Sequence, residues 1–307
     1  MNGLTGIDTN FVSAVVVTYN PDLPELWRLI DVICVQVGGV VIVDNASAYP
    51  FGEAVAVRYD GHVAFIQNHS NLGVAGGQNA GIDWARTKGA NFVVLFDQDS
   101  LPANDLIVEL CAVASEKMLA GELVAAVGPT NFDGRWQKAL PFVEVHGFGY
   151  RRMYCSEDET SVAVAHVISS GALIPMAAID RVGGMLDELF IDYIDVEWGM
   201  RAARHGLKSY GSCRGRMTHS LGNSVVNLGG RQVTMHSPQR DYYLFRNAVW
   251  MFSQSWLPLD WKIAEGRRIV LRFLFYAIFG RPWLEQLSYM SRGILDGLRG
   301  RTGIYKG

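Results

Sequence analysis

The sequence predicts an α/β protein whose central sheet is mainly parallel. Its apolar, β-branched runs are continuous rather than alternating, which is typical of strands buried on both faces. Segments with helical periodicity separate these runs, as in a sheet that is covered by helices on both sides. In addition, the first four runs each end in polar residues, and the ligands of an open parallel sheet bind at the carboxyl ends of its strands.

The first half of the chain is expected to alternate between strand and helix. The first strand is predicted at 11–20, and it ends at the turn-forming pair Asn20-Pro21. Apolar residues from Leu23 to Val37 recur at three- and four-residue spacing, which predicts a helix with one apolar face. Further strands are expected at 40–47, 62–68, 91–96 and 123–129, with helices at 76–87 and from about Asn104.

The second half is less regular. The stretch from Asn131 to Thr160 predicts long loops or an antiparallel edge, and the chain after Pro238 is expected to be mostly helical. Between them we expect strands at 164–174 and 207–213 and helices at 176–184 and 195–206.

Composition limits the class of protein. A chain of 307 residues with 49% hydrophobic residues can bury a large core, so it is one large domain or a domain with an appendage, and it is not disordered. The formal net charge is -3, but from Asp260 to the end nine basic residues face four acidic ones. This asymmetry indicates a basic appendage that meets an anionic surface, either a membrane or nucleic acid.

The cysteines and the chain ends suggest a compartment. The four cysteines are widely separated and form no CxxC pair, so we expect reduced thiols in a cytoplasmic protein. The N-terminus has no basic region followed by an apolar stretch, and a secretory signal is therefore not expected. The apolar run 269–279 is broken by Arg272 and is shorter than the roughly 20 residues that a spanning helix needs.

Paired carboxylates follow the fourth strand. Asp97 and Asp99 flank Gln98, and in an extended chain they would point to the same side, which suits a shared cation. A solvated strand end is the alternative for this short motif. Other nucleotide folds fit poorly, because no G-x-G-x-x-G follows the first strand and the Gly-rich segment 71–81 lacks the GK[ST] ending of a phosphate loop. That segment could equally be a turn with close helix packing.

A set of motifs carries a family resemblance. In chain order they are "VVVTYNP", "VIVDNAS", "NLGVAGGQNAG", "LFDQDS", "SSGALI", "DYIDVEWGMRA" and "THSLG". Over roughly residues 11 to 250 this set resembles the inverting family-two glycosyltransferases, and more narrowly the bacterial rhamnosyltransferases that use dTDP-L-rhamnose. The resemblance implies a nucleotide-sugar-binding glycosyltransferase A-type fold at 1–240 and a C-terminal helical region at 241–307.

The resemblance also implies a donor site with a divalent cation, Mg²⁺ or Mn²⁺. The nucleoside would be surrounded by Thr18, Tyr19, Asn20, Asp44 and Asn45, with Asp44 accepting a hydrogen bond from the base. Asn71, Gly73 and Gln78 would approach the ribose or diphosphate, Asp97 would lie near the ribose, and Gln98 would also bind the donor. Asp97, Asp99 and His219 would bind the metal. Without the resemblance, His219 is simply a polar loop residue.

The general base is expected in the acidic stretch before the helix at 195–206. An inverting transfer needs one carboxylate that faces the acceptor hydroxyl. The family pattern has an acidic pair here, and this chain departs from it, because the first position is Ile194. Asp195 is therefore the expected base and Asp192 the alternative. Acidic residues that stabilise a helix start would explain Glu197 but not the whole acidic cluster.

Arg246 and the tail complete the expectations. Arg246 is expected to bind the diphosphate or to be a surface arginine. The basic, aromatic tail fits attachment to an anionic membrane, or a helical subdomain that packs on the core or forms a homodimer. Nucleic-acid binding is not expected, because the rest of the chain is acidic.

The implied reaction is the transfer of L-rhamnose from dTDP-L-rhamnose to a saccharide acceptor, for example a polyprenyl-linked one. It would take place at the inner face of the cytoplasmic membrane during assembly of a surface polysaccharide such as O-antigen or a cell-wall polymer. The motif QxxRW of processive members is absent, so one transfer per acceptor is expected. A UDP-hexose or UDP-galactofuranose donor is the alternative, and a nucleotide-binding protein without transferase activity is a more distant one.

Overall fold

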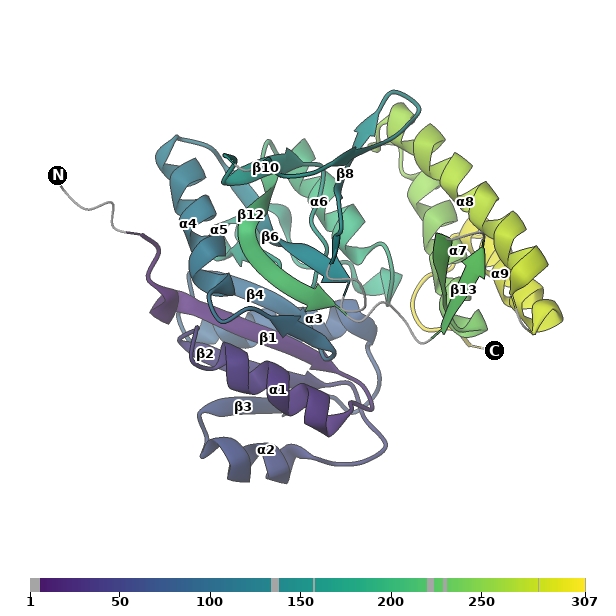
Figure 1. Cartoon of the computed structure of the whole chain (residues 1–307). Helices are drawn as coiled ribbons and strands as arrows, with labels where there is room; N and C mark the ends of the chain where they lie inside the picture. The colour runs from purple at the N-terminus through teal and green to yellow at the C-terminus, as the bar shows by residue number, and fades with distance from the viewer. Residues whose placement is uncertain are drawn as a thin grey trace.

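The computed structural model describes residues 6–133, 138–156, 158–219, 224–228, 231–280 and 282–306 (Figure 1). Within this part of the chain, the central feature is a ten-stranded mixed sheet. The main path runs in the order β10-β12-β6-β11-β4-β1-β2-β3, with β5 paired to β12 and β7 paired to β6.

The first half forms the parallel part of the sheet, as predicted. After a short 3-10 helix, η1 (Thr9–Phe11), the strands are β1 (Val12–Thr18), β2 (Gly39–Asp44), β3 (Val63–Gln67) and β4 (Phe92–Asp97). The helices are α1 (Leu23–Ile33), α2 (Gly52–Tyr59), α3 (Gly73–Thr87) and α4 (Leu106–Leu119), of which α2 was not predicted.

Strand β1 divides the core into two layers, because neighbouring side chains point to opposite faces. Ala14 and Val16 belong to the cluster that includes apolar residues of α1, α2 and α4. Val15 and Val17 belong to the cluster that includes α3. The continuous apolar runs of the sequence are therefore strands covered on both faces.

The second half completes the sheet with mixed directions. Its strands are β5 (Ser100–Pro102), β6 (Val124–Asp133), β7 (Lys138–Ala139), β10 (Ser161–Val164), β11 (Leu173–Pro175) and β12 (Lys208–His219), and a separate hairpin is formed by β8 (Phe142–His146) and β9 (Gly149–Met153). Two helices and a 3-10 turn follow β11, namely α5 (Met176–Val182), η2 (Asp187–Leu189) and α6 (Ile194–Arg204).

The strand predicted at 164–174 is wrong in its middle. A turn separates β10 from β11, and Gly171 lies in it with a φ of 83°. The Gly171 N–H donates to the carbonyl of Leu95 at 2.7 Å, and the Leu95 N–H donates to Ala172 at 3.1 Å. These contacts with β4 are distant in sequence, and local pattern therefore did not indicate the turn.

The chain after Pro238 is helical, as predicted. It forms α7 (Pro238–Ser253), α8 (Leu259–Phe279) and α9 (Trp283–Leu298), preceded by the hairpin β13 (Ser224–Leu228) and β14 (Arg231–Met235). Helix α7 begins where Ser237 caps it, with a hydroxyl that accepts from the Arg240 N–H at 3.3 Å. Phe245 and Met251 are fully buried in the same apolar cluster as α3 and α6. Among the described helices, none is both long and apolar enough to cross a membrane.

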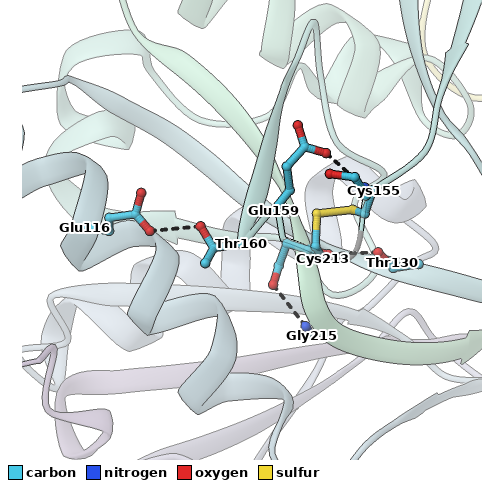
Figure 2. Close-up of a disulfide and its surroundings, with 9 residues drawn as sticks. Glu116, Thr130, Cys155, Glu159, Thr160, Cys213 and Gly215 are labelled. Carbon is cyan, nitrogen blue, oxygen red and sulfur yellow. Dashed lines mark hydrogen bonds between the residues drawn. A yellow bond between two sulfur atoms is a disulfide. The ribbon is translucent and has the colours of Figure 1, made fainter.

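The expectation of reduced cysteines is wrong for one pair. Cys155 and Cys213 form a disulfide with their Cα atoms 5.6 Å apart (Figure 2). The antiparallel pairing of β10 with β12 brings these residues together, and the Cys213 N–H donates to Thr160 at 3.0 Å. Their separation of 58 residues concealed this contact in the sequence. Cys34 and Cys111 are free thiols.

Candidate functional site

The register of β1 and β2 brings the polar strand ends together. Thr18 lies opposite Asp44, and its hydroxyl donates to the Asp44 carboxylate at 3.1 Å. Ser47 donates to the same carboxylate through its hydroxyl at 2.5 Å and through its N–H at 2.9 Å. A carboxylate has about four acceptor positions, so about one position of the buried Asp44 remains for a ligand.

The turn after β1 is held from both sides. Asn20 has a φ of 48°, and its N–H donates to the Ser47 hydroxyl at 2.7 Å. The Tyr19 N–H donates to the Gln98 side chain at 2.8 Å. Because these contacts use backbone groups, the Tyr19 ring is left 50% exposed at the strand ends. An exposed ring at this place can stack on a planar ligand.

The Gly-rich segment lies beside the same strand ends. The Asn45 amide donates to the Gly73 carbonyl at 2.8 Å, and the Gly73 N–H donates to the Asn71 side chain at 2.8 Å. Gly77 allows close packing, because a Cβ there would lie 2.6 Å from Val17. The predicted alternative of close helix packing is therefore confirmed for this glycine.

Gln78 differs from its neighbours on α3. Its side chain is buried, and its Oε1 has no hydrogen-bond partner among the described residues. An unpartnered buried acceptor is costly, and it is a group that a bound ligand could satisfy.

Asp97 ends β4 and Asp99 lies in the turn that follows, which corrects the expectation that both lie in one extended segment. Gln98 and Asp99 form the turn between β4 and β5, so the two carboxylates do not alternate along one strand. The Asp97 N–H donates to the Ser170 hydroxyl at 3.1 Å. Asp97 and Asp99 are both half-buried.

The expected metal ligands are Asp97, Asp99 and His219. The carboxylates of Asp97 and Asp99, at the end of β4 and in the turn that follows, are hard oxygen donors and fit a cation such as Mg²⁺ or Mn²⁺. The pairing of β5 with β12 places the backbone of His219 opposite Ser100, one residue after Asp99. The side chain of His219 lies outside the described residues, and the residues that are described contain no group of three or more metal-ligating side chains.

The two candidate bases have different surroundings. Asp195 lies in the first turn of α6, accepts from the Val196 N–H at 2.8 Å, and lines a small cavity with Leu95 and Ser169. Asp192 precedes the helix and forms an ion pair of 3.0 Å with Arg240 of α7. Asp195 is thus next to unfilled space, whereas Asp192 has a cation beside it.

Glu197 is structural, in agreement with the helix-start alternative. Its buried carboxylate accepts from Arg201 at 2.8 Å, and Arg201 also donates to the carbonyls of Val182 and Gly184. Glu197 therefore holds Arg201, the residue that joins α6 to the end of α5, and is not available as a base.

Both expectations for Arg246 are corrected. Arg246 is only 1% exposed, so it is not a surface arginine. Its guanidinium donates to the carbonyls of Glu188 and Leu189 at 3.1 and 2.9 Å, to the carbonyl of Gly303, and to Asn247 at 2.9 Å. With its donors directed at these groups, the side chain is part of the core and not an open diphosphate ligand.

Sequence reasoning missed Arg240. Burial lowers the pKa of Arg240, but the carboxylate of Asp192 raises it, as do Asp97 and Asp241, so the pKa lies above its usual value. Arg240 thus brings positive charge close to Asp192 in the acidic stretch and to Asp97 at the end of β4. Its position in the first turn of the helix, three residues after the cap residue Ser237, was the only sequence signal.

His166 is a second group that the sequence did not single out. Its Nδ1 is buried and has no partner among the described residues. Burial lowers the pKa of His166, while the negative charges of Asp195 and Glu265 oppose this change.

Comparison with protein families gives a clear match. The model of the family described as Glycosyl transferase family 2 matches residues 13–176, more than half of the chain. The dTDP-rhamnosyl transferase RfbF of Shigella flexneri is 31% identical over 296 residues, which cover 95% of this chain and 97% of that protein. The galactofuranosyltransferase GlfT1 of Mycobacterium tuberculosis is 28% identical, with 85% and 91% covered.

Solved structures show the same fold. The Staphylococcus aureus TarS fragment 1-349 in complex with UDP-GlcNAc has a TM-score of 0.61 and 16% identity, with 94% of this chain and 80% of that chain covered. GalNAc-T7 with UDP, GalNAc and Mn²⁺ has a TM-score of 0.57 and 15% identity, with 88% of this chain but only 57% of that chain covered. The expected nucleotide-sugar-binding A-type fold is confirmed.

Proposed function

Because the chain belongs to glycosyl transferase family 2, we propose that it transfers L-rhamnose from dTDP-L-rhamnose to a saccharide acceptor. The observation that carries the proposal is the 31% identity with a dTDP-rhamnosyl transferase over nearly the full length of both proteins. The proposed setting is the assembly of a bacterial surface polysaccharide. The weaker likeness to a galactofuranosyltransferase supports a UDP-linked donor as the alternative.

The nucleotide of the donor binds at the carboxyl ends of β1 and β2 in this proposal. Thr18, Asn20 and Asn45 shape the pocket around the nucleoside, the half-exposed ring of Tyr19 stacks on the base, and the remaining acceptor position of Asp44 takes its N–H. Asn71, Gly73 and Gln78 approach the ribose and diphosphate, and the unpartnered Oε1 of Gln78 accepts from the ribose. Gln98 holds the turn after β4 against Tyr19 by accepting a hydrogen bond from the Tyr19 N–H.

The diphosphate lies near the turn after β4. Asp97, Asp99 and His219 are the residues that would hold a Mg²⁺ or Mn²⁺ ion. When it is bound, such an ion supplies positive charge that offsets the charge of the diphosphate. Arg240, rather than Arg246, is the arginine with a partly exposed guanidinium near these carboxylates.

Asp195 acts as the general base. It accepts the proton of the acceptor hydroxyl while the hydroxyl oxygen attacks the anomeric carbon. The bond from that carbon to the diphosphate oxygen breaks, dTDP leaves, and the configuration inverts. Support comes from the ion pair of Asp192 with Arg240, since Asp195 has no such cation beside it among the described residues and lies next to a cavity of about water size.

The acceptor is proposed to be presented at an anionic membrane surface. Exposed apolar side chains lie on one side of α8, and these are Val270, Leu271, Leu274 and Ile278. A homodimer would cover the same side chains, and the two arrangements are separable. Flotation of the protein with anionic vesicles, lost in Leu271→Glu with Leu274→Glu, supports membrane attachment. A concentration-dependent dimer in sedimentation, lost in the same variant, supports dimerisation.

Calorimetry tests the donor. We expect dTDP to bind more tightly than UDP, and only with Mn²⁺ or Mg²⁺ present. Release of dTDP from dTDP-L-rhamnose, with water or a saccharide as acceptor, then measures turnover. A preference for UDP would keep the enzyme class and replace the sugar donor. Binding of NAD without a divalent ion, and of neither dTDP nor UDP, would refute the proposal.

A further inference from the structure

The segment before Asp195 has an unusual backbone. We call residues 188–193 the base loop, because it contains Asp192 and leads directly into the first turn of α6. Phe190, Asp192 and Tyr193 have φ values of 64°, 64° and 65°, in the left-handed region that side-chain-bearing residues rarely adopt. Such a conformation persists only when surrounding groups hold it, and it is frequent at active sites.

Helix α7 supplies one set of these groups through an asparagine. Asn247 is 0% exposed, and its Nδ2 donates to the carbonyls of Leu189, Ile191 and Asp192 at 2.9, 2.8 and 3.0 Å. The two amide hydrogens are therefore shared among three carbonyls of the base loop. A single buried side chain thus fixes the path of the loop across the left-handed residues.

Arg246 fixes the orientation of that asparagine. Its Nε donates to the Asn247 Oδ1 at 2.9 Å, so the amide nitrogen must face the loop. Its Nη2 donates to the carbonyls of Glu188 and Leu189. The adjacent Tyr243 ring stacks on Phe190, with ring centres 4.8 Å apart.

Helix α8 holds the other end of the loop. The Tyr193 hydroxyl donates to Glu265, which is 1% exposed. Glu265 also accepts from Tyr150 at 2.6 Å and from Arg268 at 2.8 Å. Tyr193 is the residue that caps α6, so this contact sets the start of the helix that bears Asp195.

We propose that Asn247 and Arg246 are positioning residues for the general base. They hold the base loop in its left-handed conformation, and the loop in turn sets the direction of the Asp195 carboxylate. Through these two side chains, α7 contributes to the positioning of the base. This inference rests on the proposed function, in which Asp195 is the base.

The test is the isosteric variant Asn247→Asp in the full chain, which replaces the amide donor by a carboxylate. With dTDP-L-rhamnose as the probe, we expect kcat for release of dTDP to fall about a hundredfold, as for other small misplacements of catalytic groups. The KM for the donor and the calorimetric affinity for dTDP should stay within about twofold, because Asn247 donates to Leu189, Ile191 and Asp192 and not to the Phe190 carbonyl, which meets the Gly-rich segment by accepting from the Val74 N–H at 2.7 Å. Hydrogen exchange of the peptide amides in 188–196 should become faster.

Met251→Ala is the matched control. Met251 is equally buried on α7 and belongs to the apolar cluster rather than to the hydrogen bonds with the base loop. This variant should lower the melting temperature while leaving kcat and exchange in 188–196 unchanged. If Asn247→Asp does not fold, Tyr193→Phe removes only the hydroxyl, with its contacts to Glu265 and Arg268, and should produce a smaller fall of kcat with the same unchanged donor affinity.

The outcomes separate the two claims. Wild-type protein that binds dTDP but releases none from dTDP-L-rhamnose would refute the proposed function, and the exchange measurement would still decide whether Asn247 holds the loop. Wild-type turnover in Asn247→Asp, or in Tyr193→Phe if only that variant folds, would overturn the positioning role. Faster exchange with unchanged kcat would overturn it as well, because the contact would then be merely structural.

Discussion

Asp241 is a buried acid that should make the stability of the protein depend on pH. It is 0% exposed in the first turn of α7, Gln286 donates to its Oδ2, and its Oδ1 has no partner among the described residues. Burial raises its pKa from 3.8 to about 7; Arg272 and Arg240 lower the pKa, and Asp192 raises it. The folded protein therefore retains a proton at pH 5 to 7 that the unfolded chain has lost.

The sign and size follow from this difference. Because the pKa of Asp241 is raised in the folded state, the free energy of unfolding is highest below the unfolded pKa of 3.8. It decreases as the pH rises towards 7. Each pH unit in this window corresponds to about 1.4 kcal/mol, so ionised Asp241 costs about 4 kcal/mol above pH 7. Asp241→Asn removes the charge while keeping an acceptor for Gln286.

Urea unfolding at several pH values measures the effect. Asp241→Asn should be more stable than the wild type by about 4 kcal/mol at pH 8 and by only about 1–2 kcal/mol at pH 5. Its gain should therefore shrink as the pH falls towards 4. Equal gains at pH 5 and pH 8, or no gain at pH 8, would show that Asp241 is ionised in the folded protein and that the reasoning is wrong.

Three further substitutions test the site. Asp195→Asn should leave dTDP binding intact in calorimetry and abolish dTDP release from dTDP-L-rhamnose, and retained turnover would move the base to Asp192. Asp99→Ala should remove the effect of Mn²⁺ on dTDP affinity, so an unchanged metal dependence would contradict its role as a ligand. Gly77→Ala should lower the free energy of unfolding by about 1–3 kcal/mol, because its methyl group meets Val17, and an unchanged urea midpoint would refute that contact.

The strand ends were predictable because their rule is local. A continuous apolar run followed by Asp44 or Asp97 identifies both the strand and its ligand-binding end. Parallel pairing then brings those ends together, as the register of Thr18 with Asp44 shows. No knowledge of distant contacts was needed for this part of the site.

The remaining features depend on contacts between distant segments. The disulfide of Cys155 requires the pairing of β10 with β12, which spacing alone does not reveal. The sequence predicts that Arg246 is accessible to the diphosphate, because arginine is seldom buried. Only the fold reveals that it donates to the carbonyls of Glu188 and Leu189. The position of Arg240 beside Asp192 likewise depends on how α7 packs against the base loop.

The embedding of α7 in the core limits how this enzyme can be recombined with its relatives. A chimera that exchanges the C-terminal helices for those of another transferase would separate Asn247 from the carbonyls that it holds, and Tyr243 from Phe190. Residues 188–193 and 240–247 should therefore be transplanted as one unit. Designs that cut the chain near residue 240 should lose activity even when every strand-end residue of the donor site is kept.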